Sequence, residues 1–353
     1  MRSMVFLALV LVAACSTAPI RLRGAISHPV TSDGWKLTLE RFAPAPGVVP
    51  RKVPVIVCHG VLANRNYLKL NEDASLPAVL SQRGFDVWLL DLRGREDAGS
   101  PGWFFGAQTY TYTVDDYVLR DMDTAISHVL AATGASRVVW VGHSLGGIIA
   151  YARLGSYGDA RVARLVTIGS PGRLAPASRN MLLAQGAAGG LALLPMLPVA
   201  PFAELAGFTG IPLTLPQIED TIYYRPNLSD DEHSKLLRFS SNNGSKAELR
   251  QLLGGIRQNA FFSADGKVAY SANLGNIGIP VLLVAGRRDH LADPLTVRYV
   301  YDQLPGPDKT LLIAGRGTGF SEDFGHSDLV VGDKATKEVL PRITAWLEAR
   351  DGR

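Results

Sequence analysis

Short apolar runs alternate with longer segments in which apolar residues recur every three to four positions. The runs have the length of buried strands and lie at Val53–Cys58, Phe85–Leu90, Arg137–Val141, Ala163–Ile168, Ile279–Ala285 and Lys309–Ile313. Between most of them are segments of helical period: Val114–Ala131, Leu145–Leu154, Pro294–Gln303 and Lys334–Ala349. Strands that alternate with helices predict an α/β fold, with a mostly parallel central sheet and helices on both of its faces.

Two segments do not follow this alternation of strands and helices. Apolar and polar residues alternate from Ala25 to Phe42 around Asp33-Gly34, which predicts an antiparallel hairpin. No strand is evident from residue 171 to about 274, and Met181 to Pro216 carries one charge and five prolines, too many for a membrane-spanning helix. We expect residues 171–274 to form a mainly helical cap inserted into a core made of 15–170 and 275–353. An extra helical layer packed on the core is the alternative.

The first residues have the character of an export signal. Arg2 precedes an apolar run from Met4 to Val12, and Ala13 and Ala14 lead into Cys15. Val12 to Cys15 resembles a bacterial lipobox, which implies removal of residues 1–14, acylation of Cys15 and anchoring in a membrane of the bacterial cell envelope. The residue after the cysteine, Ser16, resembles the type that directs such lipoproteins to the outer membrane. The alternative is an ordinary cleaved signal that contains a cysteine.

The composition argues against two kinds of ligand, nucleic acid and metal ions. The net charge is +4, but the basic residues are scattered and form no block with aromatics, so nucleic acid is not an expected partner. Apart from Cys15 the chain has one cysteine, Cys58, and it contains no CxxC or HExxH pattern, so no metal site is expected.

A Gly-x-Ser-x-Gly motif supplies a candidate nucleophile. Gly142-His143-Ser144-Leu145-Gly146 directly follows one apolar run and opens a segment of helical period. This strand, turn and helix setting is that of a nucleophile elbow, in which glycines permit a tight turn that exposes the serine hydroxyl. A structural serine in a glycine-rich turn is the alternative.

A serine hydroxyl needs a base and an orienting acid, which follow the elbow in the order acid, then histidine. Asp289 lies just beyond the strand expected at Ile279–Ala285, and His326 lies in a glycine-rich loop after the last expected strand. Asp293 is the second candidate acid, but its place before Pro294 is typical of a helix N-cap. Asp328 is expected to cap a helix or turn, without a catalytic role.

An oxyanion formed at the serine needs hydrogen-bond donors. We expect the backbone N–H groups of Leu145, after the nucleophile, and of Val61, in the turn after the first strand of the core, to provide them.

Four segments carry a family resemblance: His28–Gly34, followed by Leu37, Leu39 and Arg41; His59–Leu62; Gly142–Gly147; and Gly325–Leu329. They resemble the α/β-hydrolases, and within them the gastric and lysosomal acid lipases and their bacterial relatives. Animal acid lipases usually have glutamine and threonine at positions 145 and 147, where this chain has leucine and glycine. Polyhydroxyalkanoate synthases share similar segments but use a cysteine nucleophile, so Ser144 argues against a polymerase.

Together these features predict a serine hydrolase that cleaves carboxylic esters through Ser144, Asp289 and His326 without a cofactor. The apolar insertion and the expected anchor at Cys15 suggest a lipophilic acyl ester as substrate and the membrane as a partner. An acyltransferase or thioesterase with the same triad is an alternative. So is a non-catalytic, anchored scaffold protein with this fold.

Overall fold

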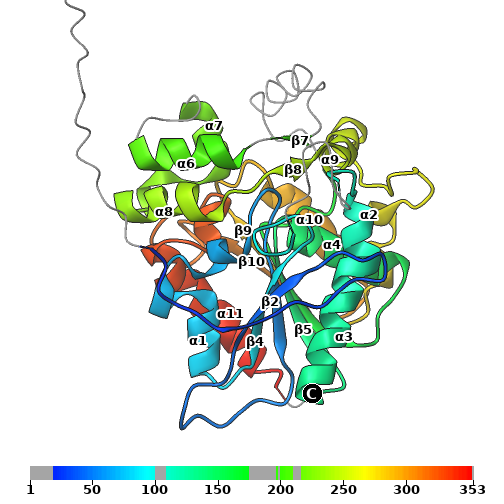
Figure 1. Cartoon of the computed structure of the whole chain (residues 1–353), viewed down its shortest axis with the longest axis horizontal. Coiled ribbons are helices and arrows are strands. Elements are labelled where there is room, and N and C mark those ends of the chain that lie inside the picture. Colours follow the sequence, from blue (N-terminus) through cyan, green and yellow to red (C-terminus); the bar gives the residue numbers. More distant parts are fainter. Residues whose placement is uncertain (1–18, 100–108, 175–195, 198, 210–215, 352–353) are drawn as a thin grey trace, which may run out of the picture.

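The computed structural model describes residues 19–99, 109–174, 196–197, 199–209 and 216–351. Its centre is an eight-stranded sheet in the order β1-β2-β4-β3-β5-β6-β9-β10 (Figure 1). β1 pairs antiparallel with β2 and β2 antiparallel with β4, whereas the remaining neighbours are parallel. The strands are β1 Ala25–Ser27, β2 Thr38–Phe42, β3 Val55–Cys58, β4 Val87–Asp91, β5 Val138–His143, β6 Val162–Ile168, β9 Val281–Gly286 and β10 Lys309–Ala314.

Helices cover both faces of the sheet, as the sequence predicts. They are α1 Leu76–Gln82, α2 Val114–Asp116, α3 Met122–Thr133, α4 Leu145–Ser156, α10 Pro294–Gln303 and α11 Leu340–Glu348. Single π-helical turns, Tyr117–Asp121 and Ala335–Val339, lead into α3 and α11. Successive residues of a strand point to opposite faces, so Ile56 packs in one core with α3, α4 and α10, while Val55 and Val57 pack in another with α1 and α11.

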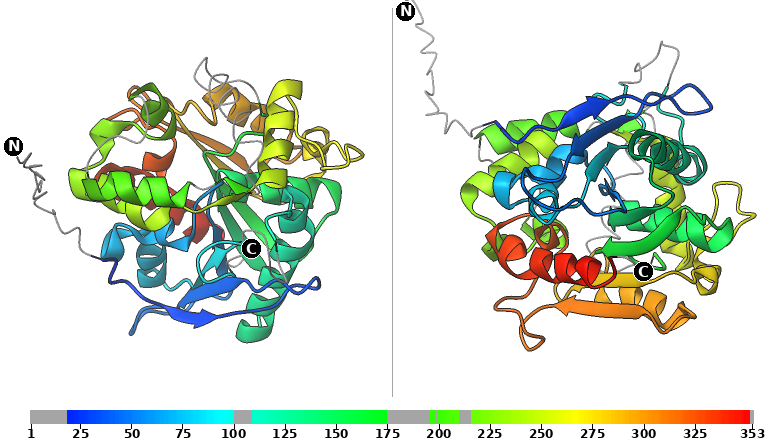
Figure 2. Two further views of the ribbon diagram at one scale, coloured as in Figure 1. Left: turned by 45° about the horizontal axis from the view of Figure 1, so that its top comes forward. Right: turned by 90° about the horizontal axis from the view of Figure 1, so that it is seen from below.

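An insertion of helices separates β6 from β9. It contains α6 Ala200–Thr209, α7 Pro216–Ile222, α8 Asp230–Ser240 and α9 Lys246–Gln258, which lie over one end of the sheet (Figures 1 and 2). α8 packs against the 3-10 turn Arg65–Lys69, which follows β3, so the insertion covers the carboxyl ends of the strands. A mainly helical insertion is therefore confirmed, while domain boundaries at 171 and 274 stay a prediction.

The structure adds two strands to the insertion that the sequence did not predict. β7 Met196–Leu197 pairs antiparallel with β8 Gly244–Ser245. Two residues are too few to show an alternating pattern, which explains why the sequence gives no sign of them. In the described part of the chain no helix is both long and apolar enough to cross a membrane. The expected signal, residues 1–14, and Cys15 lie outside the described residues.

Candidate active site

The strand register brings the turns of the candidate site together. Cys58 at the end of β3 pairs with Gly142 in β5, and His143 pairs with Ile168 at the end of β6. Ile168 in turn pairs with Val284 in β9. Because these strands are parallel, the loops that follow them leave the sheet at the same edge. The sequence places its candidate residues on these loops and on the loop after β10.

Ser144 occupies a strained backbone conformation between β5 and α4. Its φ is 52° and its ψ is −117°, a region that residues other than glycine rarely adopt. The turn leaves no room for side chains at the two motif glycines. A Cβ on Gly142 would lie 2.3 Å from the carbonyl carbon of Gly146, and one on Gly146 would lie 2.5 Å from the carbonyl oxygen of Cys58. This is the geometry of a nucleophile elbow, as the motif predicts.

Asp289 and His326 form a buried hydrogen-bonded pair. His326 Nδ1 lies 2.8 Å from Asp289 Oδ2, and the two residues are 5% and 1% exposed. Asp289 Oδ1 accepts hydrogen bonds from the backbone N–H groups of Leu291 and Ala292, at 2.9 and 2.7 Å. With Nδ1–H donated to the carboxylate, Nε2 is the ring atom left to accept a proton.

The alternative acid, Asp293, has a structural role at the start of a helix. Its Oδ1 accepts a hydrogen bond from the N–H of Leu295 at 2.8 Å, so it is the N-cap of α10. This N-cap is the role that the sequence favours for it.

Gly169 places the Asp289–His326 pair beside the elbow. A Cβ on Gly169 would lie 3.1 Å from Asp289 Oδ2 and 3.2 Å from His326 Nδ1, so this pair packs directly on the chain that follows β6. The neighbouring Ile168 carbonyl accepts a hydrogen bond from Ser144 N at 2.8 Å. The structure thus brings Ser144, Asp289 and His326 to one edge of the sheet. Gly169 was not singled out by the sequence, where it is a glycine at a strand end like many others.

The two expected oxyanion donors belong to segments that adjoin Ser144. Leu145 is the first residue of α4, so its N–H has no partner within the helix. Val61 follows Gly60, where a Cβ would lie 3.1 Å from Ser144 Cβ. The turn that carries Val61 therefore packs against the candidate nucleophile.

The insertion holds the turn of Val61 in place. The N–H of Asn242 donates to the carbonyl oxygen of Leu62 at 2.7 Å, and Ala63 forms an isolated β-bridge with Ser241. Leu62 has a positive φ of 56°, which these contacts stabilise. Residues 241–242 of the insertion are thus part of the support of the candidate oxyanion site, a link that the sequence does not reveal.

Asp328 fastens the loop of His326 to the insertion. It is fully buried, and its carboxylate accepts hydrogen bonds from Tyr224 N, Asn227 Nδ2 and Gly325 N at 2.8, 2.7 and 2.9 Å. Burial raises the pKa of this carboxyl, and the three donors act against that rise. Asp328 lies within the 3-10 turn Ser327–Leu329 and joins this loop to the insertion, which differs from the capping role that the sequence suggests.

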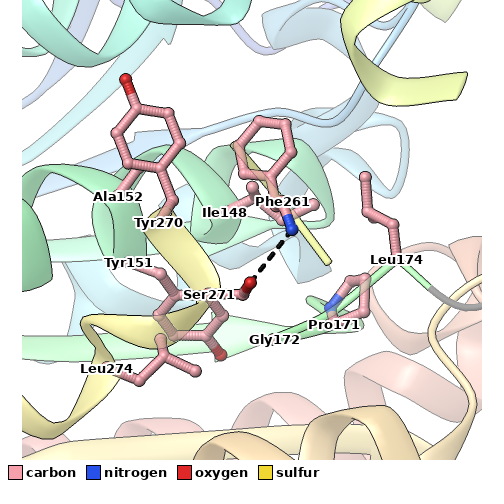
Figure 3. A pocket seen from close by; sticks show the side chains of 10 residues that line it. All are labelled: Ile148, Tyr151, Ala152, Pro171, Gly172, Leu174, Phe261, Tyr270, Ser271 and Leu274. Carbon is pink, nitrogen blue, oxygen red and sulfur yellow. Dashed lines mark hydrogen bonds between the residues drawn. The ribbon is translucent and has the colours of Figure 1, made fainter. Parts of the chain in front are cut away.

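A small pocket lies along α4, the helix that starts after Ser144 (Figure 3). Its cavity volume is about 10 Å³, room for about one water molecule, and it is partly open to solvent. The wall is mostly apolar, and a hydrogen bond of 3.0 Å from Phe261 N to Ser271 Oγ spans one side. Its lining residues are Ile148, Tyr151, Ala152, Pro171, Gly172, Leu174, Phe261, Tyr270, Ser271 and Leu274. Within the described ranges, no group of three or more His, Cys, Asp or Glu residues is arranged to hold a metal ion.

A family model described as the alpha/beta hydrolase fold matches residues 53–319, from β3 to the loop before His326. The chain belongs to the α/β-hydrolase family. The sequence resemblance on which this expectation rested is thereby confirmed at the level of the family.

Curated proteins similar to this α/β-hydrolase include lipases and poly(3-hydroxyalkanoate) polymerase subunits. Triacylglycerol lipase 2 of Arabidopsis thaliana is 29% identical over 150 residues, which cover 40% of this chain and 36% of the plant protein. The chain therefore matches about a third of that lipase's length. The poly(3-hydroxyalkanoate) polymerase subunit PhaC of Allochromatium vinosum is 28% identical over 330 residues, covering 89% of this chain and 86% of PhaC.

Solved structures show the same fold. A bacterial membrane phospholipase A superposes with a TM-score of 0.58 at 18% identity, over 93% of this α/β-hydrolase and 87% of the phospholipase. At this identity the likeness concerns the fold alone.

Proposed function

We propose that this α/β-hydrolase cleaves carboxylic esters through Ser144, Asp289 and His326. The hydrogen bond of 2.8 Å between His326 Nδ1 and Asp289 Oδ2, beside a serine in an elbow turn, is the observation that carries the proposal. A buried carboxylate so placed fixes the imidazole tautomer and stabilises the imidazolium that forms when the serine is deprotonated.

The reaction has two halves. His326 Nε2 takes the hydroxyl proton of Ser144 as the oxygen bonds to the ester carbonyl carbon, and the carbonyl oxygen becomes an oxyanion beside the N–H groups of Leu145 and Val61. The bond to the alcohol then breaks, and the alcohol leaves with the proton from His326. Water, deprotonated by His326, attacks the acyl-enzyme, releases the acid and regenerates the hydroxyl of Ser144.

The substrate in this proposal is an ester with a lipophilic acyl group. Two observations support it: the mostly apolar pocket along α4, and curated relatives whose names describe lipases. Rates with p-nitrophenyl esters of increasing chain length test it. We expect higher kcat/KM for medium or long acyl chains, and a strict preference for acetate would contradict the substrate class while leaving ester hydrolysis intact.

Covalent labelling by a fluorophosphonate tests the nucleophile and base directly. We expect labelling of the wild type and its loss in Ser144→Ala and His326→Ala. His290→Ala is the matched control, because His290 lies one residue from Asp289 but its side chain is 39% exposed. Labelling that persists in Ser144→Ala would refute the proposed nucleophile. A folded wild type that neither labels nor hydrolyses esters would favour a non-catalytic scaffold protein.

Acyl transfer is the second candidate function. The match to PhaC, named as a polymerase subunit, extends over 89% of this chain, and an acyl-enzyme can be intercepted by an alcohol instead of water. Product analysis with an ester donor and an alcohol acceptor separates the two. A transfer product that exceeds free acid at modest acceptor concentration would favour the transferase.

We also propose, on sequence alone, that Cys15 is acylated and anchors the mature enzyme in the bacterial cell envelope. Arg2, the apolar run and the small residues before Cys15 support this. Cys15→Ser should move the protein from the membrane to the soluble fraction and remove incorporation of labelled palmitate. Unchanged membrane association of this variant would contradict the anchor.

A further inference from the structure

Tyr67 lies in the 3-10 turn Arg65–Lys69, six residues after Val61. Its side chain is buried, with the residue 3% exposed. The hydroxyl donates a hydrogen bond of 3.0 Å to the carbonyl oxygen of Ser327, the residue that follows His326. Tyr67 therefore connects the segment after β3 with the loop that carries the candidate base.

His143 makes the second connection to the same loop. It is the last residue of β5, directly before Ser144, and its Nε2 lies 3.3 Å from the carbonyl oxygen of His326 and 3.3 Å from Tyr67 Oη. A carbonyl oxygen only accepts, so His143 Nε2 carries the proton. Tyr67 has given its own proton to Ser327, so its oxygen accepts from His143. This assignment accounts for all three contacts, with the Nε2–H of His143 shared between two acceptors, while the buried Nδ1 of His143 has no hydrogen-bond partner.

His143 is neutral in this arrangement. Burial, and then the nearby His326, hold the pKa of His143 well below its ordinary value. The two imidazole rings lie 4.8 Å apart, so a charged His143 would repel the imidazolium that His326 forms during the reaction. A neutral donor fastens the loop without that repulsion.

We propose that Tyr67 and His143 are positioning residues that fix the backbone of His326 relative to Ser144. The proposal rests on the ester hydrolysis proposed above. Asp289 holds the imidazole at Nδ1, while Tyr67 and His143 hold two consecutive carbonyl groups of the main chain. His143 also adjoins Ser144 covalently, so the base and the nucleophile share one support. Placement within a fraction of an ångström is what proton transfer requires.

The test begins with Tyr67→Phe, which removes a hydroxyl and keeps the ring. We expect kcat to fall about tenfold, with KM within about twofold, because the base is misplaced while substrate contacts are kept. Tyr223→Phe is the matched control. Tyr223 is 2% exposed and its hydroxyl lies 2.7 Å from His233 Nε2, whereas the link from this segment to the loop of His326 runs through the backbone N–H of Tyr224, which the substitution keeps. Tyr223→Phe should leave kcat unchanged while lowering the stability about as much as Tyr67→Phe does.

A conservative exchange at His143 tests the donor. Gln has an amide NH₂ that can replace Nε2–H, whereas Leu cannot donate. We expect His143→Gln to retain at least about tenfold more kcat than His143→Leu, by analogy with other single positioning contacts. Equal kcat in the two variants, with both folded, would show that the hydrogen bond to the His326 carbonyl does not matter.

A spectroscopic measurement keeps the inference independent of turnover. In Ser144→Ala the His326 Nδ1 proton, donated to a buried carboxylate, should give a far-downfield NMR signal that exchanges slowly with water. Adding Tyr67→Phe should speed that exchange severalfold, and adding Tyr223→Phe should not. An unchanged exchange rate and an unchanged kcat in Tyr67→Phe would overturn the positioning role, whereas loss of the proposed function would appear as an inactive wild type.

Discussion

Arg95 Nη2 lies 2.8 Å from Glu248 Oε1, and both side chains are fully buried. Arg95 belongs to the loop after β4, whereas Glu248 is in the first turn of α9 in the insertion. Arg95 also donates to the hydroxyl groups of Tyr112 and Tyr117, each at 3.2 Å. This ion pair therefore joins the insertion to the core, close to the segment that supports the turn of Val61.

Glu248→Gln should lower the free energy of unfolding by about 3 kcal/mol, because it leaves the buried guanidinium of Arg95 without a counter-charge. Urea unfolding measures this. The control is Asp333→Asn, which breaks an exposed pair with Lys337 and should cost much less, because solvent screens both charges. Equal losses in the two variants would mean that the buried pair holds the insertion no more firmly than a surface pair.

Ser144→Gly should give a more stable protein than Ser144→Ala. Glycine adopts the φ of 52° freely, which relieves about 1–3 kcal/mol of strain, while its greater freedom in the unfolded chain costs about 0.5–1 kcal/mol. We therefore expect a difference of about 1 kcal/mol in thermal or urea unfolding, with both variants inactive. A Ser144→Gly variant no more stable than Ser144→Ala would show that the elbow stores no such strain.

The sequence predicts the core well where a feature is local. Each apolar run overlaps a strand of the structure, with ends displaced by no more than about two residues, because burial on both faces of most of these strands leaves a continuous apolar signal. The elbow is equally local, since the spacing of Gly142, Ser144 and Gly146 within five residues dictates the turn. The hairpin around Asp33-Gly34 is also confirmed by the pairing of β1 with β2.

Contacts between distant segments carry no such signal. Tyr67 reaches Ser327 across 260 positions and Arg95 reaches Glu248 across 153, and neither pair follows from spacing or composition. In the sequence nothing distinguishes Tyr67 from other aromatic core residues. Only the folded position of the loop of His326 reveals its contact. The order of serine, acid and histidine could be predicted because the topology of the sheet fixes it, but the residues that hold these loops could not.

Acid should destabilise the protein through His59. Burial, and then the charge of Arg95, lower the pKa of this imidazole from 6.5 to about 3, although the Gly60 carbonyl oxygen, 2.8 Å from Nδ1, acts against that fall. Nε2 accepts a hydrogen bond from Leu92 N at 3.4 Å, as a neutral ring can. Below pH 6.5 the unfolded chain binds a proton that the folded chain does not, so unfolding becomes easier as the pH falls. Between pH 6.5 and about 3, His59 should remove about 1.4 kcal/mol of stability per pH unit.

Urea unfolding at several pH values from 7 to 5 measures this slope. Well below pH 6.5, where a histidine of the unfolded chain is mostly protonated, His59→Gln should make the slope shallower by about 1.4 kcal/mol per unit. The same slope in wild type and His59→Gln would show that His59 takes up its proton equally in the folded and unfolded chains.

Leu174→Trp should shorten the acyl chains that the enzyme prefers. Leu174 lines the pocket along α4 with Ile148 and Leu274, and a larger ring there would fill the pocket and exclude an acyl group that enters it. We expect the ratio of kcat/KM for p-nitrophenyl decanoate to that for acetate to fall about tenfold, which is the cost of excluding about one methylene from an apolar site.

The control for this substitution is Leu295→Trp, which adds the same side chain at a residue that is 70% exposed, at the start of α10. It should leave the ratio unchanged. A fall in kcat/KM by the same factor for both esters would indicate general damage from overpacking, which costs about 1–3 kcal/mol of stability in a filled core. A ratio unchanged in Leu174→Trp, with the protein folded and active on acetate, would place the acyl group elsewhere, because the proposed triad does not depend on this pocket.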